Sequence, residues 1–236
     1  MQFSIEQWRA WAPGLDSRAD WSAWFAAPRP LTAVDVPPVA FLPAMQRRRL
    51  SALARMFLHV AWPLAEGQPD LPLVFVSRHG ETPRTLSILQ ALAGDEPMSP
   101  TQFSLSVHNA VIGQWSILRG DGSEMTALAG QADGLEHALL EAASLLQEGA
   151  PAVLLVVVED RPPALYAPYI DDVPCPYALA LRLVPGTDWR LQLASAGGAP
   201  APWPHAFSLL HALLGGPASF VHHCAGRQWR WTCATA

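Results

Sequence analysis

The feature that most constrains the fold is a long helical pattern that is followed at once by a fully apolar run. Residues 129–147 place apolar side chains at helical spacing on one face, namely Leu135, Leu139, Ala142, Ala143 and Leu146. After Gly149, residues 152–158 read AVLLVVV, which is typical of a strand buried on both faces. A similar run, LPLVFVS, occupies residues 71–77. This order predicts βαβ units in an α/β fold, with a mostly parallel or mixed central sheet flanked by helices.

Shorter elements are expected on both sides of this unit. Alternation predicts an opening strand over residues 2–11, and the Pro- and Ala-rich residues 26–44 predict an irregular segment. Helical spacing predicts helices over residues 46–64, over 84–93, from Ser99 through Ile117, and over 206–214.

Two alternating runs near the C-terminal end flank a turn signal. Residues 177–184 and 189–194 alternate, and Pro185-Gly186-Thr187-Asp188 between them is typical of a turn. We therefore expect a C-terminal β-hairpin over these residues, with residues 228–232 as a last strand. Together the elements predict a single domain over residues 1–236.

Composition argues against several classes of partner. The net charge is −5 and the one basic cluster is Arg47-Arg48-Arg49, so nucleic acid is not expected. The N-terminal residues do not resemble a signal peptide, and no apolar run is long enough to span a bilayer. Three cysteines without metal-like spacing suit a reducing cytoplasm and predict no metal site. Only 15% of residues are charged, which suggests that a partner chain covers some apolar surface.

One short motif, Arg78-His79-Gly80 after the 71–77 strand, resembles the signature of the histidine phosphatases. There the histidine becomes phosphorylated and the arginine neutralises phosphate oxygens. That family has the motif on its first strand and needs a second histidine late in the chain. His205, His211, His222 and His223 lack that family's context, so phosphohydrolase activity is kept only as the alternative.

A longer constellation spans residues 99–149. Its helix Ser-x-x-x-Asn-x-x-x-Gly-x-x-Ser-Ile, the pair Thr-Ala before the next element, and the following long helix agree in order and spacing with a β-ketoacyl synthase. The chain resembles that family at Ser106, Asn109, Gly113, Ser116, Ile117, Thr126, Ala127, Asp133, Ala138 and Gly149. The resemblance implies a truncated thiolase-like fold.

One subgroup fits further phrases of the sequence. Ser-Arg-His-Gly-Glu at 77–81 and Ser-Pro-Thr-x-Phe-Ser-x-Ser-Val-His-Asn-Ala at 99–110 are similar to chain length factor proteins of aryl polyene and xanthomonadin-type pigment clusters. His79 then belongs to a family phrase without phosphatase chemistry.

The resemblance implies that Leu128 stands where an active synthase has its nucleophilic cysteine. Leucine has no lone pair with which to attack a thioester, so covalent catalysis at this position is excluded. The histidines of the synthase's second half also have no counterpart, because the His222-His223 pair lacks the family's surroundings. We therefore expect a non-catalytic subunit that has no cofactor.

The expected partner is a full-length β-ketoacyl synthase in a heterodimer, with an acyl carrier protein reached through that subunit. Whether the chain forms a homodimer alone is left open. By resemblance, the residues that contact the partner or the acyl channel are Thr101, Gln102, Phe103 and Leu105, with Asn109 after them. For Phe103, packing into the chain's own core is an equal alternative.

Overall fold

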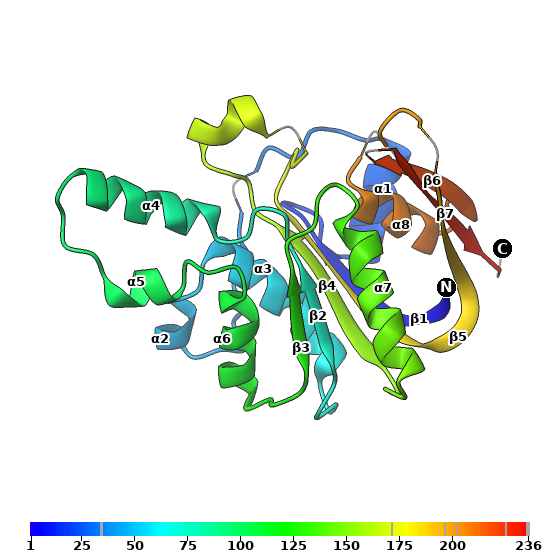
Figure 1. Ribbon diagram of the computed structural model, residues 1–236, viewed down its shortest axis with the longest axis horizontal. Helices are drawn as coiled ribbons and strands as arrows, with labels where there is room; N and C mark the ends of the chain where they lie inside the picture. Colours follow the sequence, from blue (N-terminus) through cyan, green and yellow to red (C-terminus); the bar gives the residue numbers. More distant parts are fainter. Residues whose placement is uncertain (34, 171, 196, 202, 225, 235–236) are drawn as a thin grey trace.

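The computed structural model describes residues 1–33, 35–170, 172–195, 197–201, 203–224 and 226–234. Within them, seven strands form one mixed sheet in the order β3-β2-β4-β5-β7-β6, and β1 pairs with β5 (Figure 1). The strands are β1 (Gln2–Trp11), β2 (Leu73–Val76), β3 (Met125–Leu128), β4 (Val153–Glu159), β5 (Tyr177–Ser195), β6 (Ser219–Cys224) and β7 (Arg227–Cys233). The predicted α/β fold with a mixed central sheet is confirmed.

The parallel part of the sheet is built by two crossover connections. β2 pairs in parallel with β3 on one side and with β4 on the other. Three helices connect β2 to β3, namely α4 (Thr82–Ala93), α5 (Pro100–Ser104) and α6 (Ala110–Arg119), and α7 (Gly134–Gln147) connects β3 to β4. The remaining pairings, β4 with β5, β5 with β1 and β7, and β6 with β7, are antiparallel.

Strand β4 separates two apolar cores, because all of its residues are buried. Val153, Leu155 and Val157 belong to one core, where they meet α7, α1 (Arg18–Ala26) and α8 (His205–Leu213). The alternate residues of the strand belong to the other core, with α3 (Ala52–Ala61), the 3₁₀ helix η1 (Trp62–Ala65) and α6. The period of two in a strand thus requires helices on both faces of the sheet.

Helix α1 was not expected from the sequence, although its start signal is present. Ser17 caps the helix by accepting the Asp20 amide, and Asp20 accepts the Ser17 amide in return. The helix buries Trp21 and Trp24, which pack edge-to-face on Phe207 of α8 with ring centroids 5.2 and 5.6 Å apart. The aromatic pairs join an N-terminal helix to a C-terminal one.

The expected hairpin over residues 177–194 is wrong, because these residues lie in the one long strand β5. Between Phe3 and Ser4 the pairing with β1 jumps from Trp189 to Val184, so the four turn-like residues form an irregularity within the strand. A Cβ at Gly186 would lie 1.9 Å from the Ser4 Oγ, which explains the glycine there. The C-terminal hairpin of the structure is β6–β7, and β7 includes the predicted last strand.

Three expected helices have different boundaries in the structure. The segment 46–64 contains α2 (Ala44–Arg47), α3 and η1, because Ser51 caps a new helix by accepting the Ala54 amide. The helix expected from Ser99 to Ile117 is divided into α5 and α6. The helix expected from residue 129 begins at Gly134 instead. There the chain bends so tightly that a Cβ on Gly130 would lie 2.4 Å from the Gly134 Cα.

A second 3₁₀ helix, η2 (Ala164–Tyr169), follows β4. Among the described residues, none of the helices is long and apolar enough to cross a membrane.

Neighbouring leucines of α7 test the two-core description. Leu139 is fully buried, whereas Leu140 on the next position is 41% exposed. We expect Leu139→Ala to lower the free energy of unfolding by about 2–5 kcal/mol, because it leaves a cavity in the core. The matched control Leu140→Ala should change it by less than about 1 kcal/mol. Urea denaturation measures both, and equal losses would contradict the described orientation of α7.

Candidate functional site

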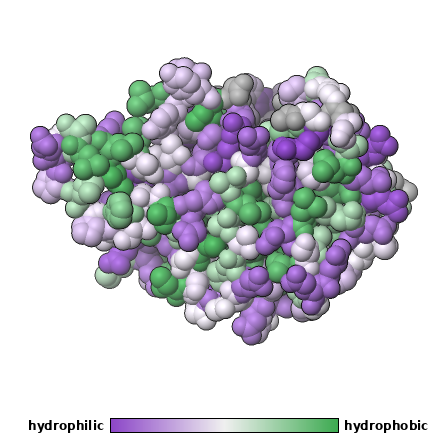
Figure 2. Space-filling view, in the orientation of Figure 1, coloured by the Kyte–Doolittle hydropathy of each residue, from purple (hydrophilic) through white to green (hydrophobic). Residues whose placement is uncertain are grey.

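Helices α4 and α5 form an arm, defined here as residues 82–104, that projects from the β3 side of the sheet (Figure 1). Neither helix contains a buried residue. Even so, the arm carries large apolar side chains that are exposed, namely Leu89, Leu92, Met98 and Phe103. Figure 2 shows hydrophobic side chains gathered over this arm. Exposed apolar groups concentrated on one projection mark an interaction surface.

A chain of hydrogen bonds fixes the root of the arm. The buried Glu81 carboxylate accepts the Ser51 hydroxyl at 2.6 Å and the Arg84 Nε–H at 3.2 Å. Arg84 also donates from Nη1 to the Gln102 side-chain oxygen at 2.6 Å. Because these contacts join α3, α4 and α5, the arm is held in one orientation without a core of its own.

A groove of about 390 Å³ lies beside the arm, between α2, α5 and α6. The residues that line it are Gln46, Arg49, Leu50, Thr101, Ser104, Leu105, Gln114, Ile117 and Leu118. Two of the residues expected at the partner or acyl-channel site, Thr101 and Leu105, are therefore brought together here. Ile117 at its rim is 82% exposed, the largest exposure among the apolar residues of α6.

The other expected site residues lie close by in the chain but play different parts. Gln102 holds α5 to α4 through Arg84, as described above. Phe103 is 61% exposed, so it does not pack into the chain's own core. Asn109 is exposed at the N-terminal end of α6, where its carbonyl accepts the Gly113 amide.

Strand β3 forms the edge of the sheet next to this surface. Among the described residues it pairs with β2 alone, and its four residues are half-buried. An edge strand of this kind presents unpaired backbone N–H and C=O groups that another strand can bind. Strand β3, the arm and the helices α2 and α6 that flank the groove lie on one side of the molecule (Figure 1).

Leu128 is the last residue of β3 and packs partly against the core that contains α7. It lies in the strand, six positions before the first residue of α7, rather than at the start of a helix. The side chain is aliphatic and offers no nucleophile. Burial raises the pKa of the Cys175 thiol to about 11, and burial also raises the pKa of Cys224, so neither is prepared as a thiolate.

The Arg78-His79-Gly80 motif forms a closed turn after β2. Glu159 at the end of β4 accepts the backbone amides of Arg78 and His79 and, at 3.1 Å, the Ser77 hydroxyl. The Arg78 guanidinium and the His79 ring both bind the Asp172 carboxylate, at 2.7 and 3.1 Å. Because both side chains already bind a carboxylate, this geometry gives the phosphohydrolase alternative no support.

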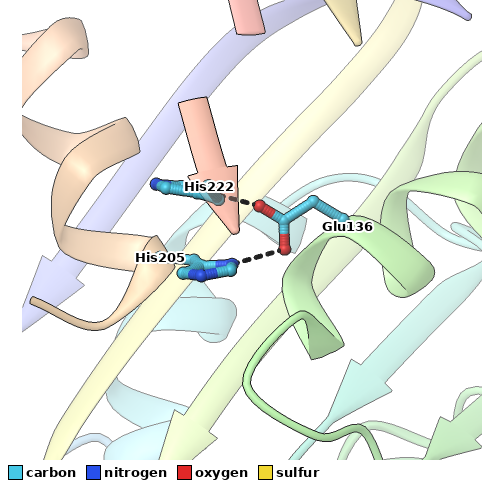
Figure 3. Close-up of side chains that lie close together, drawn as sticks. All are labelled: Glu136, His205 and His222. Atoms are coloured by element: carbon cyan, nitrogen blue, oxygen red, sulfur yellow. Dashed lines mark hydrogen bonds and ion pairs between the residues drawn. The ribbon is translucent and has the colours of Figure 1, made fainter. Parts of the chain in front are cut away.

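A second polar cluster lies within the protein, at the opposite side of the sheet from the arm. Glu136 of α7, His205 of α8 and His222 of β6 are all buried, and both histidines face the one carboxylate (Figure 3). Burial alone would raise the pKa of Glu136, but hydrogen bonds from the two histidines outweigh it and lower that pKa to about 2. The sequence pattern drew attention to both histidines but not to Glu136, and it predicted no metal site.

Sequence comparison assigns the chain to a class. The model of the β-ketoacyl synthase N-terminal domain matches residues 21–232, and the chain belongs to this family. The resemblance drawn from residues 99–149, with its thiolase-like fold, is thereby confirmed. No curated protein matches the sequence.

Several solved structures are similar to this chain. A chain from the complex of the ketosynthase ApeO with its chain length factor ApeC, from Xenorhabdus doucetiae, is 32% identical and has a TM-score of 0.87. The match covers 98% of this chain and 99% of that chain. The ishigamide ketosynthase/chain length factor is 14% identical with a TM-score of 0.63, and the match covers 83% of this chain and 68% of that chain. A Burkholderia phymatum β-ketoacyl synthase is 10% identical with a TM-score of 0.63, and the coverage is 84% and 65%. The last two show the fold alone.

The turn at Glu159 leads to a prediction about pH. Burial raises the pKa of Glu159 to about 7, from 4.5, and the nearby Asp172 carboxylate adds to the effect. The folded protein thus holds this proton more tightly than the unfolded chain does. The contribution of this proton to the free energy of unfolding is therefore complete below pH 4.5 and is lost as the pH rises through about 7.

Glutamine does not titrate, so the Glu159→Gln variant should not lose this stability. We therefore expect its free energy of unfolding to rise relative to that of the wild type, by about 3 kcal/mol, as the pH is raised from 4.5 to 8. Urea denaturation at a series of pH values measures the difference. Glu148→Gln, which removes an exposed carboxylate, is the control for the loss of one carboxyl group. If the difference in the free energy of unfolding between wild type and variant stays constant across this pH range, the raised pKa of Glu159 is contradicted.

Proposed function

We propose that the protein is a non-catalytic, ketosynthase-like subunit of the chain length factor type. In this proposal it pairs with an active β-ketoacyl synthase in type II polyketide or fatty-acid-like synthesis of the aryl polyene kind. The observation that carries the proposal is the end-to-end match, at 32% identity, to a chain of a ketosynthase–chain length factor complex. The two more distant structures are matched over only 68% and 65% of their chains.

The lack of catalysis follows from the chemistry at the proposed nucleophile position. We assign Leu128 to that position on the match of Thr126 and Ala127 to the residues before the family's cysteine. An alkyl side chain cannot form a thioester. The buried Cys175, with its raised pKa, is no substitute for an activated thiolate.

The proposed partner surface consists of the arm, the groove beside it and the free edge of β3. Burial of an exposed residue such as Phe103 or Ile117 against a partner is worth about 1.5–3 kcal/mol. The edge of β3 can also accept a partner strand through backbone hydrogen bonds. Thr101, Gln102, Phe103, Leu105 and Asn109 remain the proposed contacts to the partner or acyl channel.

Further expectations accompany this proposal. The acyl carrier protein meets the complex through the ketosynthase subunit, and the complex is located in the cytoplasm. The single sheet supports treating residues 1–236 as one domain. Without a partner, the same apolar surface provides a route to self-association.

A binding experiment tests the proposed surface. We expect the chain to co-purify with a full-length ketosynthase encoded beside it, and Phe103→Asp or Ile117→Asp to weaken binding at least about tenfold, because each places a charge in an apolar contact. The matched control is Leu193→Asp, on an exposed leucine of β5 away from the arm. Surface plasmon resonance gives the affinities. Unchanged binding by both arm variants would overturn the proposed surface.

An acylation experiment tests the non-catalytic role separately. The reconstituted complex is incubated with acyl-loaded carrier protein and each chain is weighed by intact mass spectrometry. We expect the acyl adduct on the ketosynthase subunit and none on this chain, because Leu128 has no nucleophilic atom. An adduct on this chain would refute the non-catalytic role even if the complex forms.

A further inference from the structure

The buried cluster of Glu136, His205 and His222 brings together three elements that are far apart in the chain. Glu136 lies in the first turn of α7, His205 is the first residue of α8, and His222 lies in the middle of β6. Their exposed fractions are 0%, 6% and 1%. This cluster lies outside the proposed partner surface, so the proposed function does not explain it.

Both histidines present the same ring nitrogen to the one carboxylate (Figure 3). The His205 Nδ1 is 2.8 Å from one Glu136 oxygen, and the His222 Nδ1 is 2.6 Å from the other. The two rings are stacked, with centroids 3.8 Å apart and an interplanar angle of 17°. Two nitrogen donors and a carboxylate therefore converge within the protein interior.

This donor set suits a transition-metal ion. Two imidazole nitrogens and one carboxylate oxygen form a set of three protein ligands that zinc uses in proteins. One ligand atom from each residue lies within 4.8 Å of the others. Bonds of about 2.0–2.1 Å in a tetrahedral site separate ligand atoms by about 3.3 Å, so the contacts would open by roughly 0.5 Å. Because the two rings are stacked, one imidazole must also turn out of the stack so that both Nδ1 lone pairs meet at the ion.

The surroundings of the cluster also point to a ligand. Among the described residues, the buried His222 Nε2 has no hydrogen-bond partner. In the metal-free protein the His222 Nδ1 carries the proton that it donates to Glu136, so metal binding at Nδ1 requires that this proton be lost or move to Nε2. Trp231 donates its indole N–H to Glu136 at 3.1 Å, an outer contact of the kind that orients metal-bound carboxylates.

Space for a further ligand and for entry is present beside the histidines. His205 lines a small cavity of about 30 Å³, which is large enough for a water molecule. His222 lines an open groove of about 320 Å³ between α8 and β6. A water molecule in the cavity could complete a fourth position, and the groove offers a path to the surface.

We propose that Glu136, His205 and His222 bind one divalent transition-metal ion, with zinc as the best match to the donors, and that this ion fastens α8 and the β6–β7 hairpin to α7. The site is structural, because its ligands come from three elements of the fold and are buried. The ion would replace the two histidine–carboxylate hydrogen bonds. The apo protein keeps those bonds, so it folds but is less stable.

Metal analysis of the wild-type protein tests the proposal directly. The chain is stripped with a chelator, dialysed against Zn²⁺ or Co²⁺, and freed of unbound metal. Plasma mass spectrometry should find about one zinc ion per chain, and the Co²⁺ form should show the visible absorption of a four-coordinate site. Zinc at about 100 times its Kd should raise the Tm by roughly 5–10 °C over the chelator-treated protein.

Two variants and a control locate the ion. Glu136→Gln and His222→Asn should lose the bound zinc and the Co²⁺ spectrum, whereas His223→Asn, on the next position of β6, should keep both. A wild type that retains no zinc and gives no Co²⁺ spectrum would overturn the site and leave a hydrogen-bonded network only. Unchanged metal content in both cluster variants would also overturn it, because the ion would then lie elsewhere.

Discussion

The structure depends on one buried strand, β4, whose side chains enter a different core on each face. Because every residue of β4 is buried, neither face of the sheet can be left to solvent. The chain satisfies this with α3 and α6 on one face and with α1, α7 and α8 on the other. The N-terminal and C-terminal segments thus meet over the same face, where Trp21 and Trp24 pack on Phe207.

The same constraint explains where apolar surface remains uncovered. The helices that cover β4 leave the edge of β3 free, and the arm beside it has exposed apolar side chains without a core of its own. Its root is fixed by the polar contacts of Glu81 and Arg84 rather than by apolar packing. The arm therefore presents an exposed apolar surface in a fixed orientation, as expected of a surface that a partner subunit covers.

Much of this fold is predictable from local pattern, and the failures have physical reasons. The buried strands and α7 follow from apolar period and length. The false hairpin arose because Pro185-Gly186 is typical of a turn, whereas pairing with β1 accommodates it as an irregularity within β5. Helix α1 could have been found from the capping signal of Ser17 and Asp20. At the break between α5 and α6 the His108 ring binds the Ser77 carbonyl, a tertiary contact that no local pattern contains.

The partner surface and the Glu136 cluster also differ in how far the sequence predicts them. Thr101 and Leu105 are neighbours in sequence, so a family phrase was enough to select them. The Glu136 cluster joins residues 69 and 86 positions apart, and only the packing of α8 and β6 against α7 reveals it.

Hydrogen–deuterium exchange on the free chain and on its complex with a ketosynthase tests whether the arm and the edge of β3 bind the partner. We expect the complex to slow amide exchange in α5 and β3 and to leave exchange in β6 and β7 unchanged. Slower exchange in β6 and β7, with none in α5 and β3, would contradict it.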